Sequence, residues 1–193
     1  HNILLVADEV QSGFGRTGKW FGINHFEVEP DIMTIAKGLA SGMPISGVVS
    51  RLDLMSKWIP GSHGGTYGGN AVAAAAGVAT IQAMKEEHML ENVNARGAQL
   101  VAGLAHLREK YPQIADIRGL GLMIGTEFRD AHGKPDKKFT KAVQHACIDH
   151  NMLILTAGPW DNTIRWIPPL VVTEEQINEG LNIFESALAE AAK

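Results

Sequence analysis

The sequence predicts an α/β domain at residues 1–90 followed by a small α+β domain at residues 91–193. Short aliphatic runs between glycine-rich loops fill the first part, which is typical of the buried strands of an α/β sheet. Two long helical patterns follow, and the remaining residues alternate between short strands and helices. With 193 residues, of which 45% are apolar, the chain is long enough to bury a substantial core.

Three strands are expected in the first domain. Residues 3–7 form a continuous aliphatic run, the pattern of a central parallel strand that is covered on both faces. Residues 32–36 form a second run that ends directly before Lys37. Residues 45–50 alternate small and apolar side chains, and we expect them to pair beside the second strand.

Helices are expected on either side of residue 90. A short helical turn is expected at residues 53–58, a helix capped by Asn70 at residues 71–87, and a long helix at residues 89–110. Pro112 ends the last of these.

The second domain is expected to mix strands and helices. Four strands and one helix are predicted, in chain order, at residues 114–118, 122–128, 137–150 (the helix), 152–156 and 163–167. A final helix begins at Thr173, which forms a capping box with Gln176.

Composition limits the possible partners. The formal charge is −4 and no long run of like charge occurs, so we expect neither nucleic acid nor a membrane surface as a partner. No segment approaches 18 uninterrupted apolar residues, and the start does not resemble a signal peptide, which favours a soluble, cytoplasmic protein. The single cysteine, Cys147, lies in a helical pattern that favours a buried thiol. His145 and His150 have no partner at ligand spacing, so we expect no metal site.

The beginning of the chain suggests a longer protein. The sequence opens at His1 without a methionine, and an apolar strand follows with no turn or cap before it. We therefore expect this chain to be the C-terminal part of a longer protein, with further site residues upstream.

Asp8 and Lys37 each follow a predicted strand. Ligands of open α/β sheets bind at the carboxyl ends of the strands, so this pair predicts a binding site. Pyridoxal 5′-phosphate needs a lysine to hold its aldehyde as a Schiff base and a carboxylate to keep its ring nitrogen protonated. Small residues around Lys37 leave room for a flat ring: Ala36, Gly38, Ala40, Ser41 and Gly42.

Two other interpretations of this region remain open. The spacing Gly13-x-Gly15-x-x-Gly18 matches the dinucleotide fingerprint, but polar-leaning residues separate it from the strand and an aromatic pair follows it. The run that ends at Asp8-Glu9 also resembles the Walker B strand of an ATPase, whose aspartate holds magnesium and whose glutamate is catalytic. The phosphate-binding loop that such an ATPase needs is absent from this sequence and would have to lie upstream of it.

Four segments resemble the class III pyridoxal-phosphate aminotransferases, and within them the 4-aminobutyrate and other ω-amino-acid members. The segments are residues 8–18, 30–32, 36–38 and 65–70, and the resemblance continues in register over nearly the whole chain. It implies the later half of a fold type I PLP-transferase large domain plus a small C-terminal α+β domain.

The resemblance implies roles for five residues near the cofactor. Asp8 binds the pyridine nitrogen, and Lys37 forms the Schiff base and moves the proton between the substrate Cα and the C4′ carbon of the cofactor. Val10 packs on a ring face, and Gln11 hydrogen-bonds near the phenolic oxygen. Thr66 binds the phosphate of the partner subunit's cofactor, which implies a homodimer with shared active sites.

Arg165 matches the arginine of the family that binds the substrate carboxylate. A planar guanidinium suits this task because it can hold a carboxylate with two parallel hydrogen bonds. Other phosphate donors, the aromatic residue that stacks on the ring and the acid that pairs with the substrate arginine are expected upstream.

The activity implied is transfer of an amino group from an amino acid or a 4-aminobutyrate-like ω-amine to a 2-oxo acid. A mutase, epimerase or decarboxylase of the same family is the alternative. A non-catalytic fragment and, more distantly, a Walker B ATPase also remain open.

Overall fold

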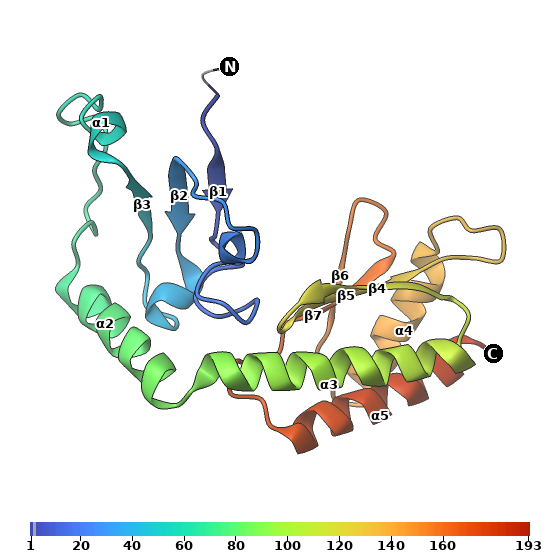
Figure 1. Cartoon of the computed structure of the whole chain (residues 1–193). Helices are drawn as coiled ribbons and strands as arrows, with labels where there is room; N and C mark the ends of the chain where they lie inside the picture. Colours follow the sequence, from blue (N-terminus) through green and yellow to red (C-terminus); the bar gives the residue numbers. More distant parts are fainter. Residues whose placement is uncertain (2) are drawn as a thin grey trace. The chain divides into compact units, whose positions relative to one another are not determined.

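The computed structural model describes residue 1 and residues 3–193. The chain divides into two compact units, His1–Leu90 and Glu91–Lys193. Each unit contains its own sheet and its own helices (Figure 1).

The first unit is built on a sheet of three strands, β1 (Val6–Asp8), β2 (Ile32–Ile35) and β3 (Gly47–Ser50). Their order is β1-β2-β3, with β1 parallel to β2 and β3 antiparallel to it. The expected pairing of the third strand beside the second is confirmed. Since β1 and β2 are parallel, their carboxyl ends lie at the same edge of the sheet.

Short and long helices complete the first unit. Two 3₁₀ helices, η1 (Gly22–His25) and η2 (Lys37–Ala40), lie in the connections around β2. The helix α1 (Leu52–Met55) is one turn long, and α2 (Ala71–Glu86) spans four turns or more. The Asn70 side chain accepts a hydrogen bond from the Ala73 N–H at 3.0 Å, which confirms the predicted cap of α2.

The strand residues of the first unit are more exposed than a central parallel strand would be. Leu4, Leu5 and Val6 are 45%, 44% and 53% exposed, and Val49 of β3 is 54% exposed. The expectation that residues 3–7 are covered on both faces is therefore wrong for this unit. The sheet has three strands among the described residues, and its aliphatic side chains extend beyond the area that its own helices cover.

The second unit contains a four-stranded antiparallel sheet and most of α3 (Met89–Lys110), which begins just before the unit does. The sheet order is β4-β5-β7-β6, so β6 lies at one edge. The elements after α3 are, in chain order, β4 (Ile114–Leu120), β5 (Met123–Phe128), α4 (Lys137–Asp149), β6 (Leu155–Ala157), β7 (Thr163–Trp166) and α5 (Glu174–Ala191).

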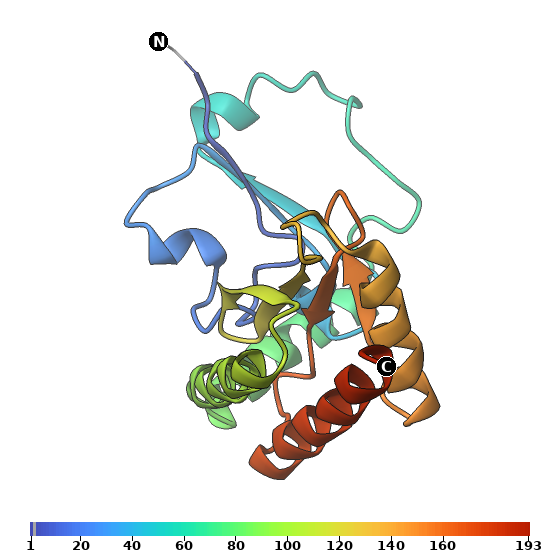
Figure 2. The ribbon, with the colours of Figure 1, turned by 90° about the vertical axis from the view of Figure 1, so that its right-hand side faces the viewer.

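The helices of the second unit cover one face of its sheet. Figures 1 and 2 show α3, α4 and α5 on the same side of these strands. Along β5 every second residue is buried, namely Ile124, Thr126 and Phe128, and these pack with the apolar residues of the helices. The Trp166 indole N–H donates to the Thr126 hydroxyl at 3.1 Å, so neither buried polar group lacks a partner. The other face of the sheet carries Arg118, Glu127 and Arg165 together with the apolar Leu155.

The predicted capping box at the start of α5 is present. The Gln176 N–H donates to the Thr173 hydroxyl at 3.2 Å, and the Gln176 side chain accepts from the Thr173 N–H at 3.0 Å. These reciprocal bonds satisfy two N–H groups that the first turn of a helix leaves free.

Gly97 of α3 approaches the loop between β4 and β5 so closely that no side chain fits. A Cβ atom there would overlap the Gly121 carbonyl, lying 2.7 Å from its carbon. We expect Gly97→Ala to lower the free energy of unfolding by about 1–3 kcal/mol, the usual cost of overpacking. Urea titration measures this change. Gly180→Ala in α5 is the matched control, because its Cβ would make only ordinary contacts of 3.7 Å or more, and equal losses in both variants would contradict the close approach.

Cys147 is buried in α4. Burial raises the pKa of its thiol to about 12, so the reactive thiolate is scarce at neutral pH. We expect the folded protein to resist labelling by iodoacetamide at pH 8, and the urea-unfolded protein to take up one label per chain. Rapid labelling of the folded protein would contradict this burial.

Candidate active site

Asp8 is the last residue of β1, and its carboxylate is held by two donors. The register of the parallel pair places Asp8 opposite Thr34 of β2. The Thr34 hydroxyl and the Val10 N–H both donate to the same oxygen, Asp8 Oδ1, each at 3.1 Å. The side chain of Asp8 is otherwise exposed. The carboxylate is therefore oriented by its neighbours while remaining open to a ligand.

Lys37 lies at the same edge of the sheet. It follows β2 directly, as the first residue of η2, and its side chain is exposed. Its φ of 40° is in the left-handed region, which is uncommon for a residue with a side chain and marks a position fixed by its surroundings. Figure 1 shows β1 and β2 running in the same direction with η2 at the end of β2. The structure thus brings an acid and an amine to one sheet edge.

Glu9, next to Asp8, has a structural role that the sequence did not suggest. It is only 3% exposed. Its two carboxylate oxygens accept hydrogen bonds from the Ser12 hydroxyl at 2.6 Å, the Gly22 N–H at 2.9 Å and the Ile23 N–H at 2.6 Å. These bonds connect the end of β1 to the start of η1. A carboxylate occupied in this way is not free to activate a water molecule.

The glycine-rich loop after Glu9 packs against the turn that carries Lys37. Phe14 is 5% exposed and meets Phe21 edge to face, with 5.5 Å between ring centroids. A Cβ atom on Gly38 would lie 3.1 Å from the Phe14 Cβ, so the two segments are already in close contact. Turns and η1 follow the last glycine of the loop rather than an α-helix. The arrangement therefore lacks the helix N-terminus that binds pyrophosphate in a dinucleotide fold.

Val10, Gln11 and Thr66 lie in loops of the same unit. Val10 and Gln11 are half-buried in the turn that follows β1, next to Asp8. Thr66 lies in the loop of residues 60–69, all of which are exposed. Within this loop, the Gly68 N–H donates to the Gly65 carbonyl at 2.9 Å, which folds the chain around Thr66.

Arg165 belongs to the second unit, on the sheet face that the helices leave open. Its neighbours along β7, Ile164 and Trp166, face the core, so the Arg165 side chain projects from the opposite face of the sheet. Gly125 and Leu155 are its register partners on the adjacent strands. Gly125 has no side chain of its own, and a Cβ atom there would lie 3.2 Å from the Thr163 methyl group.

The Arg165 guanidinium differs from the other cations of this face. Arg118 and Arg129 are both paired with Glu127, at 2.7 and 2.9 Å. The Nε atom of Arg165 is buried and has no hydrogen-bond partner within the described chain. A buried donor without a partner is costly, and an anionic ligand would satisfy it.

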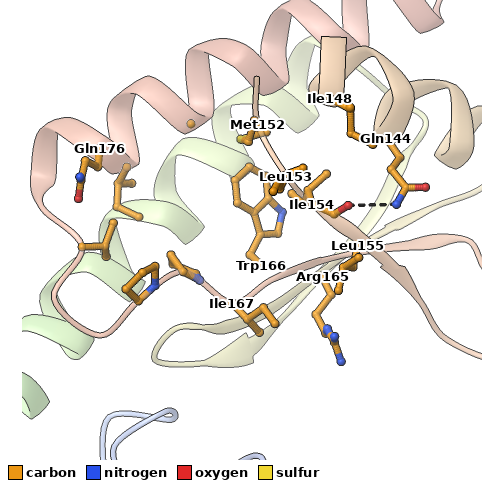
Figure 3. A pocket seen from close by; sticks show the side chains of 15 residues that line it. Gln144, Ile148, Met152, Leu153, Ile154, Leu155, Arg165, Trp166, Ile167 and Gln176 are labelled. Atoms are coloured by element: carbon orange, nitrogen blue, oxygen red, sulfur yellow. Dashed lines mark hydrogen bonds between the residues drawn. The ribbon is translucent and has the colours of Figure 1, made fainter. Parts of the chain in front are cut away.

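A cavity of about 620 Å³ lies beside Arg165 in the second unit, between the end of α4, β7 and the start of α5. Its lining is mostly apolar, and Gln144 is occupied by a hydrogen bond to the Ile154 carbonyl at 3.0 Å. Figure 3 shows the Trp166 ring among Met152 and its neighbours, whereas the Arg165 guanidinium points away from them. An anion held by Arg165 would therefore lie outside the cavity.

The described residues contain no group of three histidine, cysteine, aspartate or glutamate side chains that could hold a metal ion. No helix in residues 1 and 3–193 combines the length and apolar character needed to cross a membrane.

Comparison with known proteins identifies the family. The family model for aminotransferase class-III matches residues 1–188, which is nearly the whole chain. The chain belongs to the class III aminotransferases. It is 42% identical to the 4-aminobutyrate aminotransferase of Escherichia coli (strain K12) over 193 residues, and 40% identical to the leucine/methionine racemase of Thermococcus litoralis over 190 residues. The predicted family is confirmed.

The chain covers less than half of each of these proteins. The match takes in 99% of this chain and 45% of the E. coli relative, and 98% of this chain and 43% of the T. litoralis relative. A transaminase from a marine Virgibacillus superposes with a TM-score of 0.90 at 33% identity, over 98% of this chain and 45% of that one. These likenesses confirm the fold class, the later half of a fold type I PLP-transferase large domain plus a small C-terminal α+β domain.

Membership of the class III aminotransferases corrects two of the alternatives. The Walker B interpretation is wrong, in agreement with the occupied carboxylate of Glu9. The dinucleotide interpretation is wrong as well, because the glycine loop packs against the Lys37 turn instead of opening a helix. The cofactor of the family is pyridoxal 5′-phosphate, and an acid and an amine, the two kinds of group that its ring requires, lie at one sheet edge.

Thr34 and Glu9 are the residues near this site that sequence reasoning missed. Thr34 is placed opposite Asp8 by the register of the two parallel strands, which the sequence alone does not give. We find no sequence signal for the three donors that converge on Glu9, since they come from two turns with no regular spacing.

Proposed function

We propose that the full-length protein uses pyridoxal 5′-phosphate to transfer an amino group from an amino acid or an ω-amine to a 2-oxo acid. The observation that carries this proposal is the position of Asp8 and Lys37 at the carboxyl ends of neighbouring parallel strands, in a member of the class III aminotransferases. Open α/β sheets bind their ligands at such an edge.

In this proposal the two residues act at opposite ends of the cofactor ring. The bound cofactor supplies an electron sink for the substrate carbanion. Lys37 would hold the aldehyde end of the cofactor and would carry the proton to and from the substrate carbon as a general base and acid. Asp8 faces the ring nitrogen, and its negative charge keeps that nitrogen protonated.

Three further residues contact a cofactor in this proposal. Val10 packs on a face of the ring, and Gln11 hydrogen-bonds near the phenolic oxygen. Thr66 binds the phosphate of the cofactor in the partner subunit, so the enzyme is a homodimer with shared active sites. The exposure of the whole loop around Thr66 supports this role, because such a loop is free to reach another chain.

Arg165 binds the carboxylate of the amino donor or of the 2-oxo acid. The support is its buried Nε, which has no hydrogen-bond partner among the described residues. An arginine holds a carboxylate through two parallel hydrogen bonds, which fixes the direction of the substrate.

We also propose the place of each unit in the whole protein. Residues 1–90 are the later part of the large cofactor-binding domain, and residues 91–193 are the small domain. The exposed aliphatic side chains of β1 and β3 support this, because an apolar strand face of that kind is normally covered by more of the protein. The protein acts in the cytoplasm on small molecules, with neither nucleic acid nor a membrane as partner.

A second candidate function is epimerisation of an amino acid by the same residues. The leucine/methionine racemase of T. litoralis, at 40% identity, favours it. Racemisation needs the proton removed and returned on either side of the same substrate carbon, and it needs no 2-oxo acid.

One assay separates these functions. The full-length protein with pyridoxal phosphate is incubated with a panel of amino donors, each with 2-oxoglutarate or pyruvate, and the glutamate or alanine formed is measured. The proposal expects product only when both donor and 2-oxo acid are present. Inversion of a chiral amino acid without a 2-oxo acid, followed by chiral chromatography, would instead establish the epimerase. Neither product with any donor would contradict both.

A further inference from the structure

The side chain of Thr34 makes a direct contact with the carboxylate that we assign to the cofactor ring. Thr34 and Asp8 are register partners in the parallel pair of β2 and β1. The Thr34 hydroxyl donates to Asp8 Oδ1 at 3.1 Å, so the bond crosses between two strands that the backbone already holds together.

Thr34 also fixes the backbone immediately after Asp8. Its carbonyl oxygen accepts a hydrogen bond from the Glu9 N–H at 3.0 Å. One residue of β2 therefore holds both the carboxylate of Asp8 and the peptide that follows it. The β-branched side chain of Thr34 restricts rotation about χ1, which keeps its hydroxyl aimed at Asp8.

The two carboxylate oxygens of Asp8 differ in their hydrogen bonding. The Thr34 hydroxyl and the Val10 N–H both end on Oδ1. Rotation of the carboxylate would break both bonds, and hydrogen bonds to a charged acceptor are stronger than neutral ones. The orientation of the Asp8 carboxylate is therefore fixed before a ligand binds. Oδ2 is then the oxygen that accepts a hydrogen bond from a ring nitrogen.

We propose that Thr34 is a positioning residue, which acts on the cofactor through Asp8 and does not touch the cofactor itself. The inference rests on the proposed function, in which Asp8 faces the ring nitrogen. Its consequence is that the hydroxyl of Thr34, and not merely the volume of its side chain, sets how well the protein binds pyridoxal phosphate and turns over substrate.

The test compares Thr34→Val, which keeps the shape and removes the hydroxyl, with Thr34→Ser, which keeps the hydroxyl. Absorbance titration of the full-length apoprotein gives the dissociation constant of pyridoxal phosphate, and initial rates give kcat/KM. We expect Thr34→Val to lower both cofactor affinity and kcat/KM by about 10-fold, the size of one lost bond to a charged group. Thr34→Ser is expected to stay within about threefold of the parent protein.

A double-mutant cycle separates positioning from a general loss of structure. In an Asp8→Ala background the hydroxyl has no carboxylate to hold, so adding Thr34→Val is expected to change cofactor affinity by less than about twofold. Thermal unfolding of each apoprotein checks that it folds. If Thr34→Val does not fold, Thr34→Ala replaces it in the same cycle.

The outcomes distinguish this inference from the proposed function. Equal effects of Thr34→Val and Thr34→Ser, or a 10-fold loss that persists in the Asp8→Ala background, would overturn the role of Thr34 while leaving the function intact. Failure of the parent protein to bind pyridoxal phosphate would overturn the proposed function itself.

Discussion

Replacing Lys37 with alanine is expected to reduce amino transfer by at least about 100- to 10,000-fold, the range typical of a lost general acid–base group. Lys37 lies at the sheet edge that carries Asp8, and the variant removes the amine that, in the proposed function, both holds the cofactor and carries the proton. Initial rates of glutamate or alanine formation measure the loss in the full-length protein.

Two controls make the Lys37 result specific. Lys138→Ala removes another exposed lysine, on α4 of the second unit, and is expected to leave the rate unchanged. A small primary amine added to the Lys37→Ala protein is expected to restore part of the rate, because it can carry the proton in solution. Full activity in Lys37→Ala would show that another residue performs this chemistry.

Replacing Asp8 with asparagine is expected to lower kcat/KM by about 100- to 1,000-fold, the cost of removing one preorganised electrostatic partner. Asparagine keeps an oxygen that can accept from Thr34 and Val10, so the local structure is retained. The variant loses the negative charge that, in the proposed function, keeps the ring nitrogen protonated. The covalent link to Lys37 is expected to form as before, because the aldehyde lies at the other end of the ring.

The Asp8 prediction is checked by two measurements on the same variant. Borohydride reduction reports the covalent link, and steady-state kinetics report turnover. If both the covalent link and turnover are lost, Asp8 supports the fold of the site rather than the protonation of the ring nitrogen. Turnover equal to that of the parent protein would remove Asp8 from the mechanism.

Local signals in the sequence predicted most elements of the fold. The long helix at residues 89–110 has the predicted bounds, because its apolar stripe and the following proline are visible in the sequence. The caps at Asn70 and Thr173 also form as predicted. Such features depend on residues within one or two turns, so the chain itself specifies them.

Features that depend on distant segments were predicted less well. The edge strand β6 begins at Leu155, three residues later than expected, because pairing with β7 rather than its own pattern defines its start. The exposure of Val6 likewise depends on what covers the sheet. In both cases the deciding atoms belong to other parts of the protein.

The candidate site shows the same division. Asp8 and Lys37 could be selected from the sequence because each follows an aliphatic run that ends in a charged residue. The hydroxyl of Thr34 could not be assigned to Asp8 without the register of the two strands. The burial of Glu9 depends on donors from a separate turn, which no periodic pattern reveals.

Reductive trapping followed by peptide mapping tests the Lys37 assignment most directly. The full-length protein is incubated with pyridoxal phosphate, reduced with borohydride and digested, and the pyridoxyl group is located by mass spectrometry. We expect it on Lys37 alone, and we expect it to disappear in Lys37→Ala. A pyridoxyl group on another lysine, or one that persists without Lys37, would contradict the assignment of the site to this edge of the sheet.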